Sequence, residues 1–122
     1  MNSQQSVVGL IHKRKARHAL PRELYTDNEV YRQDLEHIWH KDWIFAGHTI
    51  ELDKPGQYFT LQIGDYPVAV VKGKDGQVRA FHNACRHRGA KVCEHAQGKV
   101  AKLVCPYHKW TFELDGSLLF AG

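Results

Sequence analysis

The sequence has few cysteines and no long apolar segment, and each shortage excludes a class of protein. Three cysteines in 122 residues, an odd number, do not suggest a disulfide scaffold. In a cytosolic protein they indicate metal binding or packing instead. No segment approaches the ~20 apolar residues of a membrane helix. The first apolar run, Val7 to Ile11, precedes positive charge, which is the reverse of a secretory signal. We therefore predict a cytoplasmic protein without a membrane segment.

The excess of positive over negative charge is also small. Seventeen Lys and Arg against thirteen Asp and Glu give a net charge of +4. The whole excess comes from the four Lys and Arg residues between His12 and His18. Such a stretch can contact nucleic acid or membrane, but a solvated terminus is the simpler interpretation, and we predict neither partner. Residues 1–20 are accordingly predicted to form a flexible basic arm.

A short helical segment is predicted over residues 21–43. Thr26 and Asp27 are both suitable N-caps, and apolar residues then recur at helical spacing as far as Trp39. With 43% hydrophobic residues, the remainder of the chain fits one globular domain.

After Trp43 the pattern changes to short runs rich in β-branched and aromatic residues, separated by turn residues such as Asp75-Gly76 and Asp115-Gly116. These runs predict a mainly β, antiparallel domain over residues 44–122. The strands are expected at 58–63, 67–71, 77–82, 100–104, 110–114 and 118–120.

Two short motifs carry the chemistry. Cys85 and His87 form a C-x-H pair, and Cys105 and His108 form a C-x2-H pair, with seventeen residues between His87 and Cys105. Each motif offers one thiolate and one imidazole, which suit zinc or iron–sulfur clusters. Structural zinc sites usually carry separate cysteine and histidine pairs, whereas here both pairs are mixed. Mixed pairs suit a two-iron cluster in which one iron takes both cysteines and the other takes both histidines. A zinc site and unrelated structural residues remain alternatives.

The motifs and the phrases around them, CRHRG and CPYHKW, resemble the Rieske domain of non-haem iron oxygenase α subunits of the ring-hydroxylating type. The resemblance runs from about Leu20 to the last residue. The phrase WIFAGH and the stretch from Gly64 to Pro67 are similar in particular to a subgroup that demethylates or hydroxylates quaternary ammonium compounds, such as glycine betaine or stachydrine.

The resemblance implies a Rieske-type antiparallel β-sandwich with two cluster-binding loops, preceded by a short helix. It implies one [2Fe–2S] cluster bound by Cys85, His87, Cys105 and His108. A reductase or ferredoxin would supply electrons to a mononuclear Fe(II) in a separate catalytic domain of a mono- or dioxygenase, in a trimeric parent. We expect this chain to lack that domain, to be truncated at its C-terminus and to transfer electrons only. The alternative is a stand-alone Rieske ferredoxin.

Other residues near the motifs have predicted roles as well. Respiratory Rieske proteins carry a disulfide and a serine hydroxyl beside the cluster, where this sequence has Ala90, Tyr107 and Trp110, so we predict a reduction potential in the low part of the Rieske range. Trp110 is expected in the core, with shielding of the cluster as the alternative. Cys93 is predicted to be a buried hydrophobe, and His82 to be structural.

Overall fold

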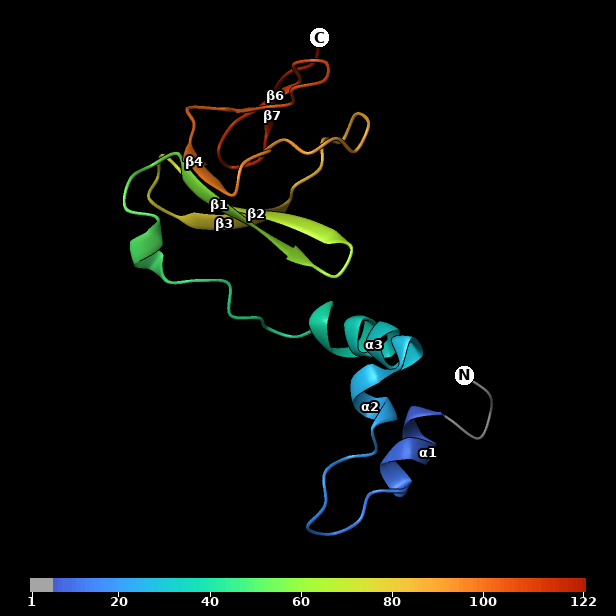
Figure 1. The fold of residues 1–122 in the computed structure, drawn as a ribbon. Coiled ribbons are helices and arrows are strands. Elements are labelled where there is room, and N and C mark those ends of the chain that lie inside the picture. The colour runs from blue at the N-terminus through green and yellow to red at the C-terminus, as the bar shows by residue number, and fades with distance from the viewer. Residues whose placement is uncertain (1–5) are drawn as a thin grey trace. The chain divides into compact units, whose positions relative to one another are not determined.

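The computed structural model describes residues 6–122, which divide into two compact units between Ile44 and Phe45 (Figure 1). The first unit is helical and the second is built from strands. None of the helices within residues 6–122 has both the length and the apolar character needed to cross a membrane.

The first unit begins with a helix that the sequence analysis does not anticipate. Helix α1, Val7–His12, lies in the segment expected to be a flexible arm, of which residues 1–5 fall outside the described part of the chain. The Ser6 side chain caps the helix by accepting a hydrogen bond from the Gly9 N–H at 3.1 Å. Leu10 is 2% exposed. The short apolar run therefore forms a capped turn of helix with one buried side chain, rather than an extended arm.

The predicted helix is present as α2, Glu23–Thr26, and α3, Asn28–Asp34, which continues into a π-helical turn, Leu35–Trp39. Of the two predicted N-caps, Asp27 caps α3, and its carboxylate accepts hydrogen bonds from the N–H groups of Glu29 and Val30. Thr26 instead ends α2. A charged N-cap satisfies two of the free N–H groups at this helix end.

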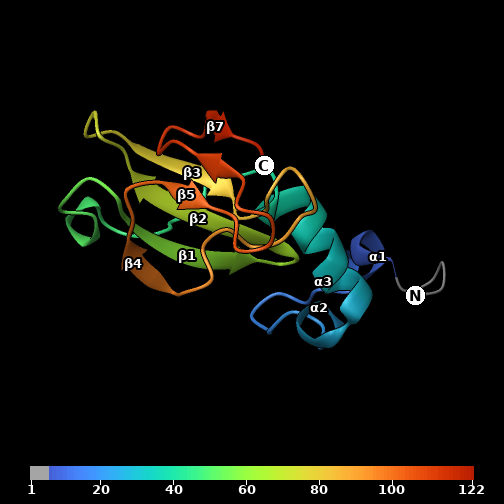
Figure 2. The same cartoon turned by 90° about the horizontal axis from the view of Figure 1, so that it is seen from above.

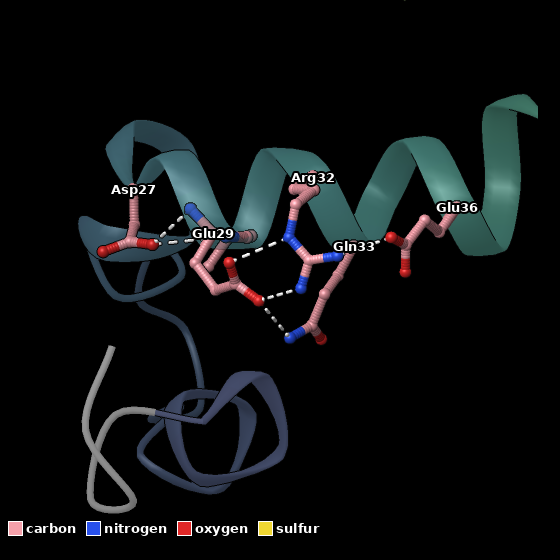
Figure 3. Close-up of polar contacts among 6 residues, drawn as sticks. Asp27, Glu29, Arg32, Gln33 and Glu36 are labelled. Carbon is pink, nitrogen blue, oxygen red and sulfur yellow. Dashed lines mark hydrogen bonds and ion pairs between the residues drawn. The ribbon is translucent and has the colours of Figure 1, made fainter.

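Along α3, Arg32 lies between two carboxylates, Glu29 one turn before it and Glu36 one turn after it (Figure 3). The Arg32 side chain, together with a hydrogen bond from Gln33, lowers the pKa of Glu29 to about 2. These side chains are largely in solvent, so the two ion pairs add little to the free energy of unfolding. Their spacing of three and four residues is the one that favours a helix.

The second unit is organised around a four-stranded antiparallel sheet in the order β3-β2-β1-β4. Three of the strands follow one another along the chain and lie side by side (Figures 1 and 2). The strands are β1, Gln57–Ile63, β2, Tyr66–Lys72, β3, Val78–His82, and β4, Gln97–Lys99.

Strand β4 was not predicted, because a strand was expected to begin only at residue 100. Its sequence, Gln-Gly-Lys, has no strand preference, and the pairing depends on the backbone. Gly98 pairs with Tyr58 of β1, and a Cβ at Gly98 would come within 2.8 Å of the Tyr58 hydroxyl. The glycine therefore allows the tyrosine ring to lie against the β4 backbone.

A smaller antiparallel sheet contains β5, Leu103–Val104, β6, Thr111–Phe112, and β7, Leu118–Phe120, in the order β5-β6-β7. It lies over one face of the larger sheet (Figures 1 and 2). The two sheets share one core, and the mainly β fold and its paired sheets are as predicted. The buried residues of the core are Tyr58, Ala69, Val71, Cys93, Leu103 and Leu114, with Phe81, Val92, Val100 and Phe112 packed against them.

Candidate metal centre

The first motif forms a tight loop directly after β3. The Cys85 N–H donates to the Ala90 carbonyl at 2.7 Å, and the Gly89 N–H donates to the Cys85 carbonyl at 2.7 Å. These two hydrogen bonds close the loop from Cys85 to Ala90. Gly89 has a φ of 74°, in the left-handed region that favours glycine. The loop leaves Cys85 buried and the His87 side chain exposed.

The second motif forms the same loop at the tip of the β5–β6 hairpin. The Cys105 N–H donates to the Trp110 carbonyl at 2.8 Å, and the Lys109 N–H donates to the Cys105 carbonyl at 3.0 Å. Lys109 has a φ of 61°, at the position that Gly89 occupies in the first loop. The two motifs therefore share one backbone geometry, although their histidines stand at different positions within it.

The two loops bring the four predicted ligands together as two pairs. Cys85 and Cys105 are each 2% exposed, and the Cys85 side chain lies near enough to lower the pKa of the Cys105 thiol. The His87 and His108 rings lie edge to face, with centroids 5.1 Å apart. Within residues 6–122, no group of three or more His, Cys, Asp or Glu side chains is placed to hold a single metal ion. Two buried thiols beside two imidazoles fit the donor set of a two-iron cluster.

The environment of Cys105 favours its thiolate. Burial raises the pKa of the thiol, but this effect is outweighed by hydrogen bonds from the N–H groups of Tyr107 and His108, from the Cys85 thiol, and by the charge of Lys109, so the pKa lies below its ordinary value. Because the thiolate is the metal-binding form, these donors prepare Cys105 to bind a metal.

The third cysteine lies elsewhere. Cys93 is 6% exposed and belongs to the core, where burial raises the pKa of its thiol. The prediction that it is a buried hydrophobe is confirmed. His82 is exposed, and its ring lies at a T-shaped angle to Tyr66 of the neighbouring strand, with centroids 5.6 Å apart; its structural role stays a prediction.

Asn83 is a part of the site that sequence reasoning missed. It is 3% exposed, and its side-chain amide donates to the Cys93 carbonyl at 2.7 Å. Its side-chain oxygen accepts hydrogen bonds from the N–H groups of Val92 and Cys93 at 3.1 and 2.8 Å. Asn83 thus ties both ends of the first loop region together. A single asparagine after a strand carries no sequence signal that would distinguish it from a turn residue.

The expected place of Trp110 in the core is wrong. The core of residues 6–122 contains its neighbours Phe112 and Leu114, whereas the Trp110 indole stacks on the His87 ring with centroids 4.6 Å apart and an angle of 5°. Its place in the second motif, two residues after His108, was the available signal. Tyr107, in turn, is 71% exposed and tilts against His108.

The exposed histidines have cationic neighbours in the sequence. Arg86 and Arg88 adjoin His87, Lys109 adjoins His108, and all three are exposed. None of the ion pairs found within residues 6–122 includes any of these three side chains. The two ligand loops therefore carry three exposed cations that take part in none of these ion pairs.

Comparisons with known proteins agree with this geometry. The Rieske [2Fe–2S] domain family matches residues 42–120. The glycine betaine monooxygenase oxygenase subunit of Chromohalobacter salexigens is 48% identical over 120 residues, which are 98% of this chain and 27% of the relative. This chain thus spans about a quarter of the length of that relative.

Solved structures show the same similarity. The quaternary ammonium Rieske monooxygenase CntA in complex with L-carnitine has a TM-score of 0.78 and 40% identity, covering 83% of this chain and 29% of that one. Naphthalene 1,2-dioxygenase from Rhodococcus sp. has a TM-score of 0.86 and 31% identity, covering 98% of this chain and 27% of that one. The resemblance seen in the sequence is confirmed, and the chain belongs to the Rieske [2Fe–2S] domain family.

Proposed function

We propose that this chain is the electron-transfer domain of the α subunit of a Rieske non-haem iron oxygenase. The observation that carries the proposal is the arrangement of the candidate ligands: both thiols are buried, with Cys85 lowering the pKa of Cys105, and the two exposed imidazole rings lie edge to face with centroids 5.1 Å apart. Cys85 and Cys105 would hold one iron, and His87 and His108 the other. The [2Fe–2S] cluster supplies one-electron redox chemistry, at a higher potential than an all-cysteine cluster because two neutral imidazoles replace two thiolates.

The residues of this chain have separate tasks in that proposal. The thiols are buried, which keeps the sulfur side of the site away from water, and the backbone N–H groups of Tyr107 and His108 point at the Cys105 sulfur. The exposed His108 is the ligand that would face the catalytic domain of a neighbouring subunit. The positive rim of Arg86, Arg88 and Lys109 would meet an acidic surface of the partner.

The partners and parent follow from the same proposal. Electrons would come from a reductase or ferredoxin and leave for a mononuclear Fe(II) in a catalytic domain, within a homotrimeric parent. Similarity to oxygenase subunits over 98% of this chain, including the helical unit, supports this proposal over a stand-alone ferredoxin. The 48% identity to a glycine betaine monooxygenase subunit supports a quaternary ammonium substrate, oxidised by hydroxylation or N-demethylation. The lack of a disulfide among the three cysteines of residues 6–122 is consistent with a cytoplasmic location, which we propose.

The test is electron paramagnetic resonance of the dithionite-reduced chain, with iron and zinc measured on the same sample. We expect about two irons per chain and a rhombic signal with an average g below the free-electron value. Cys85→Ala should abolish the signal, whereas the control Cys93→Ala, which also removes a buried thiol, should retain it. One zinc per chain without a signal, or loss of the signal in the control alone, would refute the ligand assignment.

A further inference from the structure

Trp110 joins the two ligand loops. Its carbonyl accepts the N–H of Cys105 at 2.8 Å and so closes the second loop. Its indole lies parallel to the imidazole of His87, which belongs to the first loop, at 4.6 Å. One residue therefore connects the backbone of one loop to a proposed ligand of the other.

The equivalent residue of the first loop makes no such contact. The loops share their geometry, so the counterpart of Trp110 is Ala90, which follows Gly89 as Trp110 follows Lys109. Ala90 has no ring to place on His108. Consequently one face of His87 is covered by a parallel aromatic ring, whereas the aromatic neighbours of His108 within residues 6–122 are His87, at a T-shaped angle, and the tilted ring of Tyr107.

The position of Trp110 is not explained by packing of the sheets. The ring is partly buried and lies outside the core that residues 6–122 form. Its indole Nε1 is shielded from water, with no hydrogen-bond partner in the described part of the chain. An indole N–H that is buried without an acceptor costs free energy. The ring nevertheless lies flat on the His87 imidazole, so we assign its role to that contact and not to the core.

We propose that Trp110 is a positioning residue for His87, an inference that rests on the proposed function. The stacked indole holds the plane of the imidazole and keeps water from one of its faces. Two thiolates balance the positive charge of the oxidised [2Fe–2S] core, and the two imidazoles are neutral, so the oxidised centre is neutral. The reduced centre carries one more electron and is anionic. Excluding water disfavours the anion, and the electron-rich face of the indole does so too. Trp110 therefore lowers the reduction potential.

The experiment measures the midpoint potential and the histidine nitrogen couplings by pulsed electron paramagnetic resonance on the cluster-loaded chain. Trp110→Phe keeps a flat ring, and Trp110→Ala removes it. Trp110→Leu keeps apolar bulk without the ring, so it also serves as the test if the alanine variant does not load. Trp43→Ala is the control, because Trp43 is 104% exposed.

We expect the potential to rise in the alanine variant and, by less, in the leucine variant, with changed histidine couplings in both. The phenylalanine variant and the control should resemble the unmodified chain. Equal shifts in the phenylalanine and alanine variants would assign the effect to the indole N–H and overturn the proposal, as would unchanged values in the alanine and leucine variants. If the unmodified chain itself lacks the signal, the proposed function fails instead.

Discussion

Asn83 is the buried polar residue on which the shape of the first ligand loop depends. Its side chain makes three hydrogen bonds to the backbone of Val92 and Cys93. Asn83→Ala would remove all three and leave two N–H groups and one carbonyl without these partners. At about 1 kcal/mol of net stabilisation for each bond, the loss comes to about 3 kcal/mol.

A loss of this size is a large fraction of the stability of a small domain, which is of the order of 5–15 kcal/mol. For a domain of this size, each kcal/mol shifts the melting temperature by roughly 4–8 °C, so the midpoint should fall by roughly 12–24 °C. The assay is thermal and urea unfolding followed by circular dichroism, with cluster content followed by visible absorbance. The control is Asn28→Ala, which changes an exposed asparagine at the start of α3.

We expect the control to remain within about 0.5 kcal/mol of the unmodified chain. We expect Asn83→Ala to lose stability and also cluster content, because Cys85 stands two residues after Asn83. A change below about 1 kcal/mol, the value of a single hydrogen bond, would show that the three contacts do not hold the loop.

Three further predictions concern the loops and the strand turns. Gly89→Ala should lower the free energy of unfolding by about 1–2 kcal/mol, because a Cβ there has open space and only the φ of 74° opposes it; Lys109→Gly should raise it, and thermal unfolding tests both signs. Arg79 lowers the pKa of Asp75 to about 2, so their contribution is complete above about pH 4 and lost as the pH falls towards 2. The difference in stability between the unmodified chain and Asp75→Asn should shrink over that range, and a constant difference would contradict the pairing. The midpoint potential should lie in the low part of the range from about −150 to +300 mV, and a titrated value above about +100 mV would contradict it.

The sequence predicted the architecture well where local patterns decide it. Alternating and β-branched runs located β1, β2 and β3, and the Asp115-Gly116 turn located the β6–β7 hairpin. Strand β4 was not predicted, because its pairing depends on the absence of a side chain at Gly98, which faces Tyr58 about forty residues earlier. Helix α1 was not predicted, because a six-residue helix has too little hydrophobic periodicity to distinguish it from a mobile terminus.

The candidate site shows the same division. The four candidate ligands could be selected from the sequence because cluster chemistry restricts both residue type and spacing, and their role as ligands stays a prediction. The specific contacts of Asn83 and Trp110 could not be predicted, because each acts on a segment that only the folded chain brings near. Asn83 reaches residues about ten positions further on, and Trp110 reaches His87 in the other loop.

The smaller sheet has a consequence for how the chain matures in the cell. Strands β1 to β3 close short loops in sequence, so they can form early and quickly. Strands β5 to β7 span only two or three residues each. The first ligand loop follows β3 of the larger sheet and the second joins β5 to β6, so a metal bound by both loops would link the two sheets. We therefore expect cluster insertion to be the last folding step. In iron-starved cells the unfastened β5–β7 segment would be accessible to proteases, so the amount of this protein would follow the iron supply.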